Sequence, residues 1–288
     1  MLRGEPIFKA ALWMLVALAS FSLMAVAAKE LSVSLGTAQI LFFRSVIGLL
    51  LILAFVSVRG WDLGRFKTRC FKRHLFRNLA HFVGQYGWIY GLGFIPLAEV
   101  FALEFTVPIW TALAATLLLN ERMNKSRVIA IALGLVGVLI ILRPTMLIIH
   151  PAALAVLVSA VAFGLSHTLT RSLVQQDAPL AIIFYMCLIQ LPMALGLSLG
   201  NWQMPTGNLW FWLLLIGTTA MSAHYSVSKA LSYADAMVVI PMDFLRLPLI
   251  MLVGYFFYEE AIDGFLLLGA ALMLLGNYWG LKRERPTR

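Results

Sequence analysis

The sequence predicts an all-α polytopic membrane protein with ten transmembrane helices, arranged as an inverted repeat of two five-helix halves. Three observations lead to this prediction. The 288 residues are 61% hydrophobic and only 12% charged, with a mean hydropathy of +0.90, whereas soluble domains carry about 25% charged residues. The apolar residues fall into separate stretches of membrane-spanning length. The second half of the chain also repeats features of the first.

The apolar stretches follow one another along the whole chain and are each long enough to be a transmembrane helix. They cover about 8–28, 37–58, 74–94, 97–119, 127–142, 149–171, 179–199, 209–231, 236–257 and 263–281. The first ends in Ala25-Val26-Ala27, which is also typical of a cleaved signal peptide. Because this stretch has a counterpart deep inside the chain, we expect it to be a retained helix.

The fourth stretch is unusual because it carries both an acid and a proline, Glu104 and Pro108, inside an apolar run. The ninth stretch carries the same combination as Asp243 and Pro248. A carboxylate inside a membrane is costly, so an intramembrane acid indicates a functional site. Its occurrence in both halves indicates that the chain is duplicated.

An alignment of the two halves supports the duplication. At an offset of 142 residues it pairs Phe21 with Phe163, Lys29 with Arg171 and Phe42 with Phe184. At an offset of 139 it pairs Glu104 with Asp243 and Glu121 with Glu260, and one inserted residue brings Pro108 onto Pro248. The predicted repeats cover residues 8–142 and 149–281. Because each contains five helices, an odd number, the second repeat must lie in the membrane with the opposite orientation.

The positive charges predict the orientation of the chain. With the N-terminus in the cytoplasm, 18 of the 22 Lys and Arg residues fall on the inner side, and only Lys29 and Arg143 fall outside. Arg44 and Arg246 lie within helices. The positive-inside rule therefore places both termini in the cytoplasm. The basic run at 65–77 then indicates an anchor on the inner leaflet rather than a nucleic-acid site, and the net charge of +9 has the same origin.

Several short motifs resemble the EamA family of the drug/metabolite transporter superfamily. They are Phe43-Arg44, Pro108 before the run Thr111-Ala112-Ala114-Ala115, Leu-Leu-Asn-Glu121-Arg122 and the segment from Ala234 to Pro248. The resemblance covers essentially the whole chain. It implies a ten-helix secondary transporter of the bacterial inner membrane that moves an organic metabolite. Members of the family carry amino acids, metallophores, riboflavin or S-adenosylmethionine.

The intramembrane charges and prolines each allow two interpretations. Arg44 and Glu104 lie at similar depth and are expected to form either a structural ion pair or a gate whose pairing changes. Asp243 and Arg246 are three residues apart and can pair on one helix. Pro108 and Pro248 each remove a helical hydrogen bond, which predicts either a static kink or a hinge.

Polar and aromatic residues at mid-membrane level predict the substrate cavity. The candidates are Gln85, Tyr86, Tyr90, His167, His224 and Tyr225. Gln85 and Tyr86 align with His224 and Tyr225 in the repeat. Flat rings, amides and imidazoles favour a planar, hydrogen-bonding, largely uncharged solute. Among the solutes that the resemblance implies, riboflavin or a similar neutral vitamin is the expected substrate.

Other functions find less support in the sequence. The histidines lack the spacing of a metal site, and no phosphate-binding glycine loop is present, so we expect no metal, no cofactor and no coupling to ATP. A membrane-embedded transferase would need clustered catalytic residues or a large soluble loop. An exporter of an amino-acid-like metabolite, a metallophore or an S-adenosylmethionine-like solute is the alternative within transport. A homodimer stays open.

Overall fold

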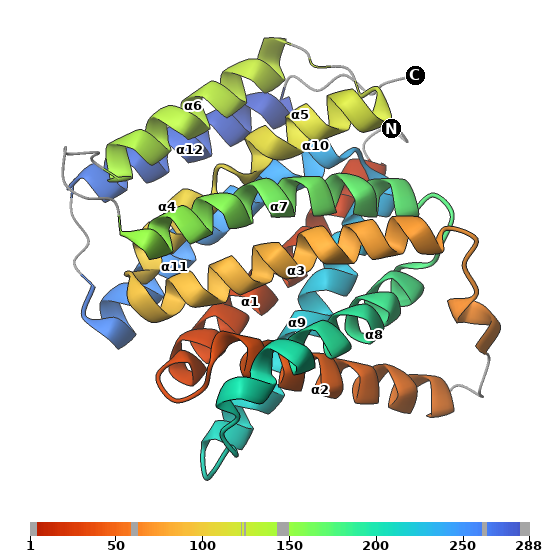
Figure 1. Ribbon diagram of the computed structural model, residues 1–288. Coiled ribbons are helices and arrows are strands. Elements are labelled where there is room, and N and C mark those ends of the chain that lie inside the picture. Colours follow the sequence, from red (N-terminus) through yellow and green to blue (C-terminus); the bar gives the residue numbers. More distant parts are fainter. Residues whose placement is uncertain are drawn as a thin grey trace.

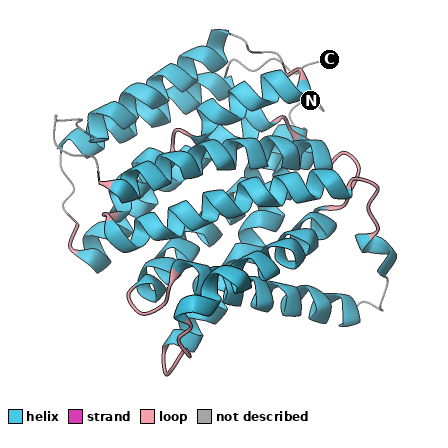
Figure 2. Cartoon of the chain, viewed as in Figure 1, coloured by secondary structure: helices cyan, strands magenta, loops and turns pink. Residues whose placement is uncertain are grey.

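Helices account for the regular structure of the chain. The computed structural model describes residues 5–58, 63–121, 123, 125–142, 150–260 and 264–282, and these ranges contain helices and loops without a strand (Figure 2). A helix satisfies its backbone hydrogen bonds internally, as an apolar environment requires. In chain order the elements are α1 (Glu5–Ser32), α2 (Thr37–Val58), η1 (Leu63–Phe66), α3 (Phe71–Phe94), α4 (Leu97–Glu104), α5 (Val107–Leu119), α6 (Lys125–Leu142), α7 (Pro151–Leu173), α8 (Pro179–Ser198), η2 (Leu199–Asn201), α9 (Leu209–Tyr233), α10 (Ala236–Val239), η3 (Ile240–Leu245), α11 (Arg246–Tyr258) and α12 (Gly264–Lys282).

Six helical segments of the described chain are long and apolar enough to cross a membrane. They are Pro6–Ser32, Thr37–Val58, Leu97–Leu119, Pro151–Leu173, Pro179–Asn201 and Ala236–Tyr258. The four remaining predicted stretches are also helical, as α3, α6, α9 and α12. Large apolar side chains cover the outside of the bundle, and Leu117 and Phe257 are 79% and 75% exposed. Such surfaces mark contact with lipid. The all-α membrane fold class is confirmed, and the number of ten crossings stays a prediction.

The two halves of the chain interleave within one bundle. α1 packs along α9 and α3 along α7, so each pair joins one helix from each half. α2 packs against α8, and α6 packs against α12 at the opposite side of the bundle (Figure 1). Exchanging the first half for the second converts the α1–α9 pair into the α7–α3 pair and leaves the α2–α8 and α6–α12 pairs unchanged. This arrangement is the one expected of an inverted repeat.

The contact between α3 and α7 depends on glycine. A Cβ atom at Gly87 would lie 2.5 Å from the carbonyl oxygen of Ala155, and one at Gly91 would lie 2.3 Å from Cγ2 of Val156. Small residues let two membrane helices approach closely. This close contact fixes the rotation of α3, and with it the direction of the polar side chains that α3 carries.

Two predicted helices are interrupted part-way along their length. In the first half, α4 ends at Glu104 and α5 begins at Val107 after a short turn. In the second half, the short α10 continues through the 3₁₀ segment η3 before α11 begins. Pro108 lies in the first turn of α5, where its missing N–H leaves no helical hydrogen bond unmade. These interruptions bring Glu104 and Asp243 to the wall of one cavity.

Candidate functional site

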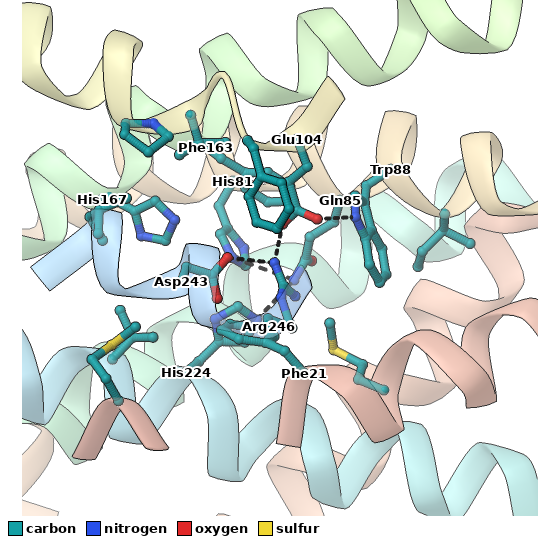
Figure 3. A pocket seen from close by; sticks show the side chains of 18 of the residues that line it. Phe21, His81, Gln85, Trp88, Glu104, Phe163, His167, His224, Asp243 and Arg246 are labelled. Carbon is teal, nitrogen blue, oxygen red and sulfur yellow. Dashed lines mark hydrogen bonds and ion pairs between the residues drawn. The ribbon is translucent and has the colours of Figure 1, made fainter. Parts of the chain in front are cut away.

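A cavity lies between the two halves, and both halves supply its walls (Figure 3). About 780 Å³ between its walls, counted together with space open to solvent, is not occupied by protein atoms. The lining residues are Met14, Phe21, Met24, Arg44, His81, Gln85, Trp88, Ile89, Glu104, Phe105, Val107, Pro108, Phe163, His167, Ile216, His224, Val227, Ile240, Asp243 and Arg246. The cavity is thus mostly apolar and aromatic, with a small set of polar groups.

Arg246 is the centre of an ionic cluster on the cavity wall. Its Nη2 lies 2.8 Å from Oε1 of Glu104 and 2.5 Å from Oδ2 of Asp243 (Figure 3). The other oxygen of Glu104 accepts a hydrogen bond of 2.7 Å from the indole N–H of Trp88. The guanidinium also lies over the ring of Phe21, 5.1 Å from its centroid. One cation therefore joins an acid from each half of the chain.

A second chain of polar side chains runs from α2 to α9. Arg44 donates from Nη2 to Oε1 of Gln190 at 2.8 Å, and Nε2 of Gln190 lies 2.9 Å from Nδ1 of His81. The amide nitrogen of Gln85 lies 3.5 Å from Nε2 of His81 and 3.2 Å from Nε2 of His224. All five side chains are buried. Four helices are linked in this way by one hydrogen-bonded chain, which ends at the cavity.

Three of the predicted cavity residues line the cavity in the structure. Gln85, His167 and His224 all belong to its wall. His224 also packs edge-on against the ring of Phe21, with 5.3 Å between centroids. Their contact with a substrate stays a prediction.

The three predicted tyrosines do not line the cavity, which corrects the expectation from the sequence. Tyr86 is 37% exposed, and Tyr90 packs beside Phe94. Tyr225 packs edge-on against Trp13 with 5.7 Å between ring centroids. An α-helix has 3.6 residues per turn, so consecutive residues point about 100° apart. Tyr86 and Tyr225 therefore face away when their neighbours face the cavity.

The predicted pairing of Arg44 with Glu104 is wrong. Glu104 pairs with Arg246 at 2.8 Å, whereas Arg44 contacts the neutral side chain of Gln190. Depth along the membrane was the only basis for the predicted pair, and α2 and α4 are not among the helices that pack closely together. The local pair of Asp243 with Arg246 is present. A role of these charges as a gate stays a prediction.

The two prolines occupy different positions relative to the cavity. Pro108 lines it, beside the break between α4 and α5. Pro248 lies in the first turn of α11, after η3, and is not among the lining residues. Both prolines therefore follow an interruption of the helix, and their action as hinges stays a prediction.

Sequence reasoning missed several residues of the site. Gln190 is the only strongly polar side chain within α8, and a lone amide in an apolar span was the signal that could have identified it. Phe21 and Phe163, which the repeat alignment pairs, lie on opposite parts of the wall and pack near His224 and His81. Their pairing had served only as a sign of duplication.

A polar contact holds together the end of the bundle at which α1 ends. Glu260 accepts hydrogen bonds from the backbone N–H groups of Leu97 and Ala98, at 2.9 and 3.3 Å, and lies 3.5 Å from Nζ of Lys29. The hydroxyl of Tyr258 donates to Oε1 of Glu30, the residue after Lys29 in α1. The end of α11 and the residues directly after it are thereby bound both to α1 and to the first turn of α4.

The opposite end carries the equivalent contact. Glu121, which the repeat pairs with Glu260, accepts a hydrogen bond of 3.4 Å from the N–H of Ala236, the residue equivalent to Leu97. It lies 4.0 Å from Nε of Arg171, which the repeat pairs with Lys29. Burial, with a smaller contribution from the negative charge of Asp235, raises the pKa of the Glu121 carboxyl. Each half therefore ends its interrupted helix with an acid that binds the start of the other half's interrupted helix.

Both of these acids follow the same backbone turn. Asn120 and Glu259 have a φ of 54°, in the left-handed region. The next N–H bonds six residues back, from Glu121 to Ala115 and from Glu260 to Gly254. A left-handed residue in this position ends a helix and turns the chain back over its last residues.

Comparison with known proteins identifies a family and several relatives that are similar to this chain. The model of the EamA-like transporter family matches residues 8–143 and 150–279. A riboflavin transporter of Rhizobium johnstonii is 35% identical, over 95% of this chain and 91% of its own length. A riboflavin transporter of Vibrio cholerae is 31% identical, over 100% and 98%. An S-adenosylmethionine uptake transporter of Rickettsia prowazekii is 25% identical, over 96% and 93%.

A solved structure has the same fold. A chain described as "Crystal structure of protein" superposes with a TM-score of 0.77 at 18% identity and covers 94% of this chain and 96% of its own. The family model matches in two consecutive ranges, and these ranges together span most of the sequence. The protein is therefore a transporter and not an enzyme, and it belongs to the EamA-like transporter family.

Proposed function

We propose that the substrate is a flat, uncharged, hydrogen-bonding metabolite, with riboflavin as the best candidate. The lining of the cavity carries this proposal. Phe21, Trp88, Phe105 and Phe163 supply ring surfaces, on which a planar solute can pack. The amide of Gln85 and the imidazoles beside it supply neutral hydrogen-bonding groups. Such a mixture orients a flat heterocycle without requiring it to be charged.

The balance of charge in the cavity supports a neutral solute. Two arginines, Arg44 and Arg246, and two acids, Glu104 and Asp243, line it. With neutral histidines, the formal charges of this lining cancel. A solute with a full charge would face at least one like-charged group in surroundings of low dielectric, where repulsion is strong.

The relatives support the same substrate. The proteins of Rhizobium johnstonii and Vibrio cholerae that are named riboflavin transporters match this chain at 35% and 31% identity over nearly its full length. The relatives named S-adenosylmethionine uptake transporters match at a lower identity of 25–26%.

Transport by alternating access would use the two ends of the bundle. We infer ten crossings of a bacterial inner membrane with both termini in the cytoplasm, on the basis of the positive charges in the sequence. The Glu121 contact then lies at the cytoplasmic end and the Glu260 contact at the outer end. Opening one contact while the other holds would expose the cavity to one side at a time.

S-adenosylmethionine is the second candidate. One oxygen of Asp243, Oδ1, is buried without a hydrogen-bond partner, and a carboxylate oxygen can bind an ammonium group. Arg44 lines the same cavity and opposes a cation. The two candidates therefore differ in whether the cavity must hold a charged group of the solute.

Uptake by the purified protein in liposomes tests the proposal. Labelled riboflavin should accumulate in saturable fashion, and unlabelled S-adenosylmethionine should compete poorly. The variant Val227→Trp, which fills the cavity, should abolish uptake, whereas Val158→Trp on the exposed surface of α7 should retain it. Size-exclusion chromatography shows whether both variants fold. Uptake of S-adenosylmethionine but not of riboflavin would contradict the proposal.

A further inference from the structure

Arg44 is a buried cation without an acidic partner. Its side chain is 2% exposed and lines the cavity. Within the described residues, Gln190 is its one hydrogen-bond partner, and no carboxylate lies within ion-pairing distance. Its Nε and Nη1 atoms are buried without any partner. Burying a guanidinium in this state is costly unless another group completes its hydrogen bonds.

The other arginines of the bundle differ from Arg44 in this respect. Arg246 binds two carboxylates. Arg77 is equally buried but donates from Nε to Thr170 and from Nη1 to Asn78, and it does not line the cavity. Arg44 alone combines a place on the cavity wall with two unused nitrogens, among the arginines of the described chain. An occupant of the cavity is the group that can complete its hydrogen bonds.

The polar chain that starts at Arg44 has a fixed direction. Arginine has no acceptor, so the atom of Gln190 that it contacts must be the amide oxygen. The amide nitrogen of Gln190 must then donate to Nδ1 of His81, so the proton of His81 lies on Nε2. The structure places the amide nitrogen of Gln85 nearest this N–H, but only an oxygen can accept from it. The oxygen and nitrogen of the Gln85 amide are therefore exchanged, which leaves the side chain in the same place. The Gln85 –NH₂ group then takes the position that has no partner.

Arg44 and Gln85 thus both line the cavity, and each has a donor without a partner within the described residues. A matching solute presents acceptors, such as the carbonyl oxygens of a pyrimidinedione ring. A carboxylate would also match Arg44, but it would place a third negative charge in a cavity that already contains Glu104 and Asp243. A neutral carbonyl edge satisfies the donors without that repulsion.

We propose that Arg44 is a specificity-determining residue that binds the carbonyl edge of the substrate's heterocyclic ring, with the amide of Gln85 beside it. This inference rests on the proposed function and names the end of the flavin that Arg44 recognises. The pyrimidinedione oxygens lie at Arg44, and the opposite, dimethylbenzene end packs among the aromatic side chains of the wall.

Two variants at different positions test this role, so a folding defect in one of them leaves the other informative. Arg44→Lys keeps the charge but removes the planar set of donors. Gln190→Glu keeps Arg44 and places a carboxylate oxygen where the amide oxygen lies 2.8 Å from it, so that Arg44 acquires a permanent anionic partner. Arg77→Lys is the matched control, because it makes the same change in a buried arginine outside the cavity.

The measurement is binding to the purified protein, followed by quenching of flavin fluorescence. The ligands are riboflavin, 2-thioriboflavin with a weaker acceptor at the carbonyl edge, and an analogue altered at the dimethylbenzene end. We expect Arg44→Lys and Gln190→Glu to weaken riboflavin binding by about tenfold or more, the scale of a lost hydrogen bond to a charged group. Both variants should also lose the preference of the wild type for riboflavin over 2-thioriboflavin. Arg77→Lys should keep the affinity and the preference.

The outcomes separate this inference from the proposed function. If wild-type protein binds no riboflavin, the proposed function fails and the inference with it. If the wild type binds riboflavin and Arg44→Lys or Gln190→Glu still prefers it over 2-thioriboflavin to the same degree, the substrate is right and the role of Arg44 is wrong. If the two variants instead lose the preference for riboflavin over the analogue altered at the dimethylbenzene end, the flavin binds in the reverse direction and the role of Arg44 is wrong.

Discussion

Glu260→Gln should open the end of the bundle at which α1 ends. The substitution keeps the size of the side chain but removes the charge that binds two backbone N–H groups of α4 and Lys29. Leu97 and Ala98 donate to different oxygens of Glu260, and Gln has only one acceptor oxygen. One of the two hydrogen bonds therefore becomes neutral and the other is lost, at a cost of about 1 kcal/mol. The lost ion pair with the partly exposed Lys29 adds up to about 1 kcal/mol. A total of about 2 kcal/mol shifts the ratio of closed to open forms about 30-fold.

Pulsed electron–electron double resonance between two spin labels at this end measures the shift from the closed to the open form. Val33 and Phe257 are 85% and 75% exposed, so labels there should not disturb the packing, in a background that lacks the native Cys70 and Cys187. We expect Glu260→Gln to increase the population with a longer label distance.

Glu121→Gln is the control for this prediction, because it makes the equivalent change at the opposite end. In an alternating mechanism it should favour the form in which the labelled end stays closed. The reasoning is refuted if Glu260→Gln leaves the distances unchanged, or if both variants lengthen the same distance.

Three further substitutions test the surrounding structure. Arg246→Met should lower the free energy of unfolding by about 3 kcal/mol, because two partly buried carboxylates lose their buried cation. An unchanged unfolding midpoint in detergent would contradict the cluster. Glu259→Gly should raise the free energy of unfolding by about 1 kcal/mol, since a φ of 54° is strained for Glu. Asn120→Gly should raise it less, because Asn tolerates this region better. Equal gains would argue against backbone strain. Gly164→Val should separate α5 from α7 and destabilise the protein, because even a Cβ would lie 2.6–2.8 Å from α5 atoms. Gly36 has open space around it, so Gly36→Val should be tolerated. Equal stability of the two variants would refute the close packing.

The repeat allowed much of the architecture to be predicted from the sequence. Helices follow from long apolar stretches, and an odd number of helices per half implies the inverted arrangement. The alignment also paired Glu121 with Glu260 and Lys29 with Arg171, and the structure places these residues in equivalent contacts at the two ends. Sequence equivalence was informative here because symmetry repeats a contact as a whole.

The direction of side chains and the choice of partners could not be predicted in the same way. Gln85 and Tyr86 are adjacent in the sequence, and only the packing of α3 against α7 decides which of them faces the cavity. Arg44 and Glu104 lie at similar depth, yet Glu104 pairs with Arg246. Depth and periodicity leave the rotation of each helix and the identity of its neighbours undetermined, and both depend on tertiary contacts.

The pair of adjacent residues on α3 offers the most direct test of riboflavin binding in the central cavity. Gln85 lines the cavity, and Tyr86, the next residue, points away from it. Riboflavin binding to purified wild-type protein, Gln85→Ala and Tyr86→Ala should be compared by flavin fluorescence under identical conditions. We predict saturable binding that weakens about tenfold in Gln85→Ala and stays within twofold of the wild type, on the order of experimental error, in Tyr86→Ala. Absence of binding to the wild type, or a loss that follows Tyr86 and not Gln85, would contradict the account.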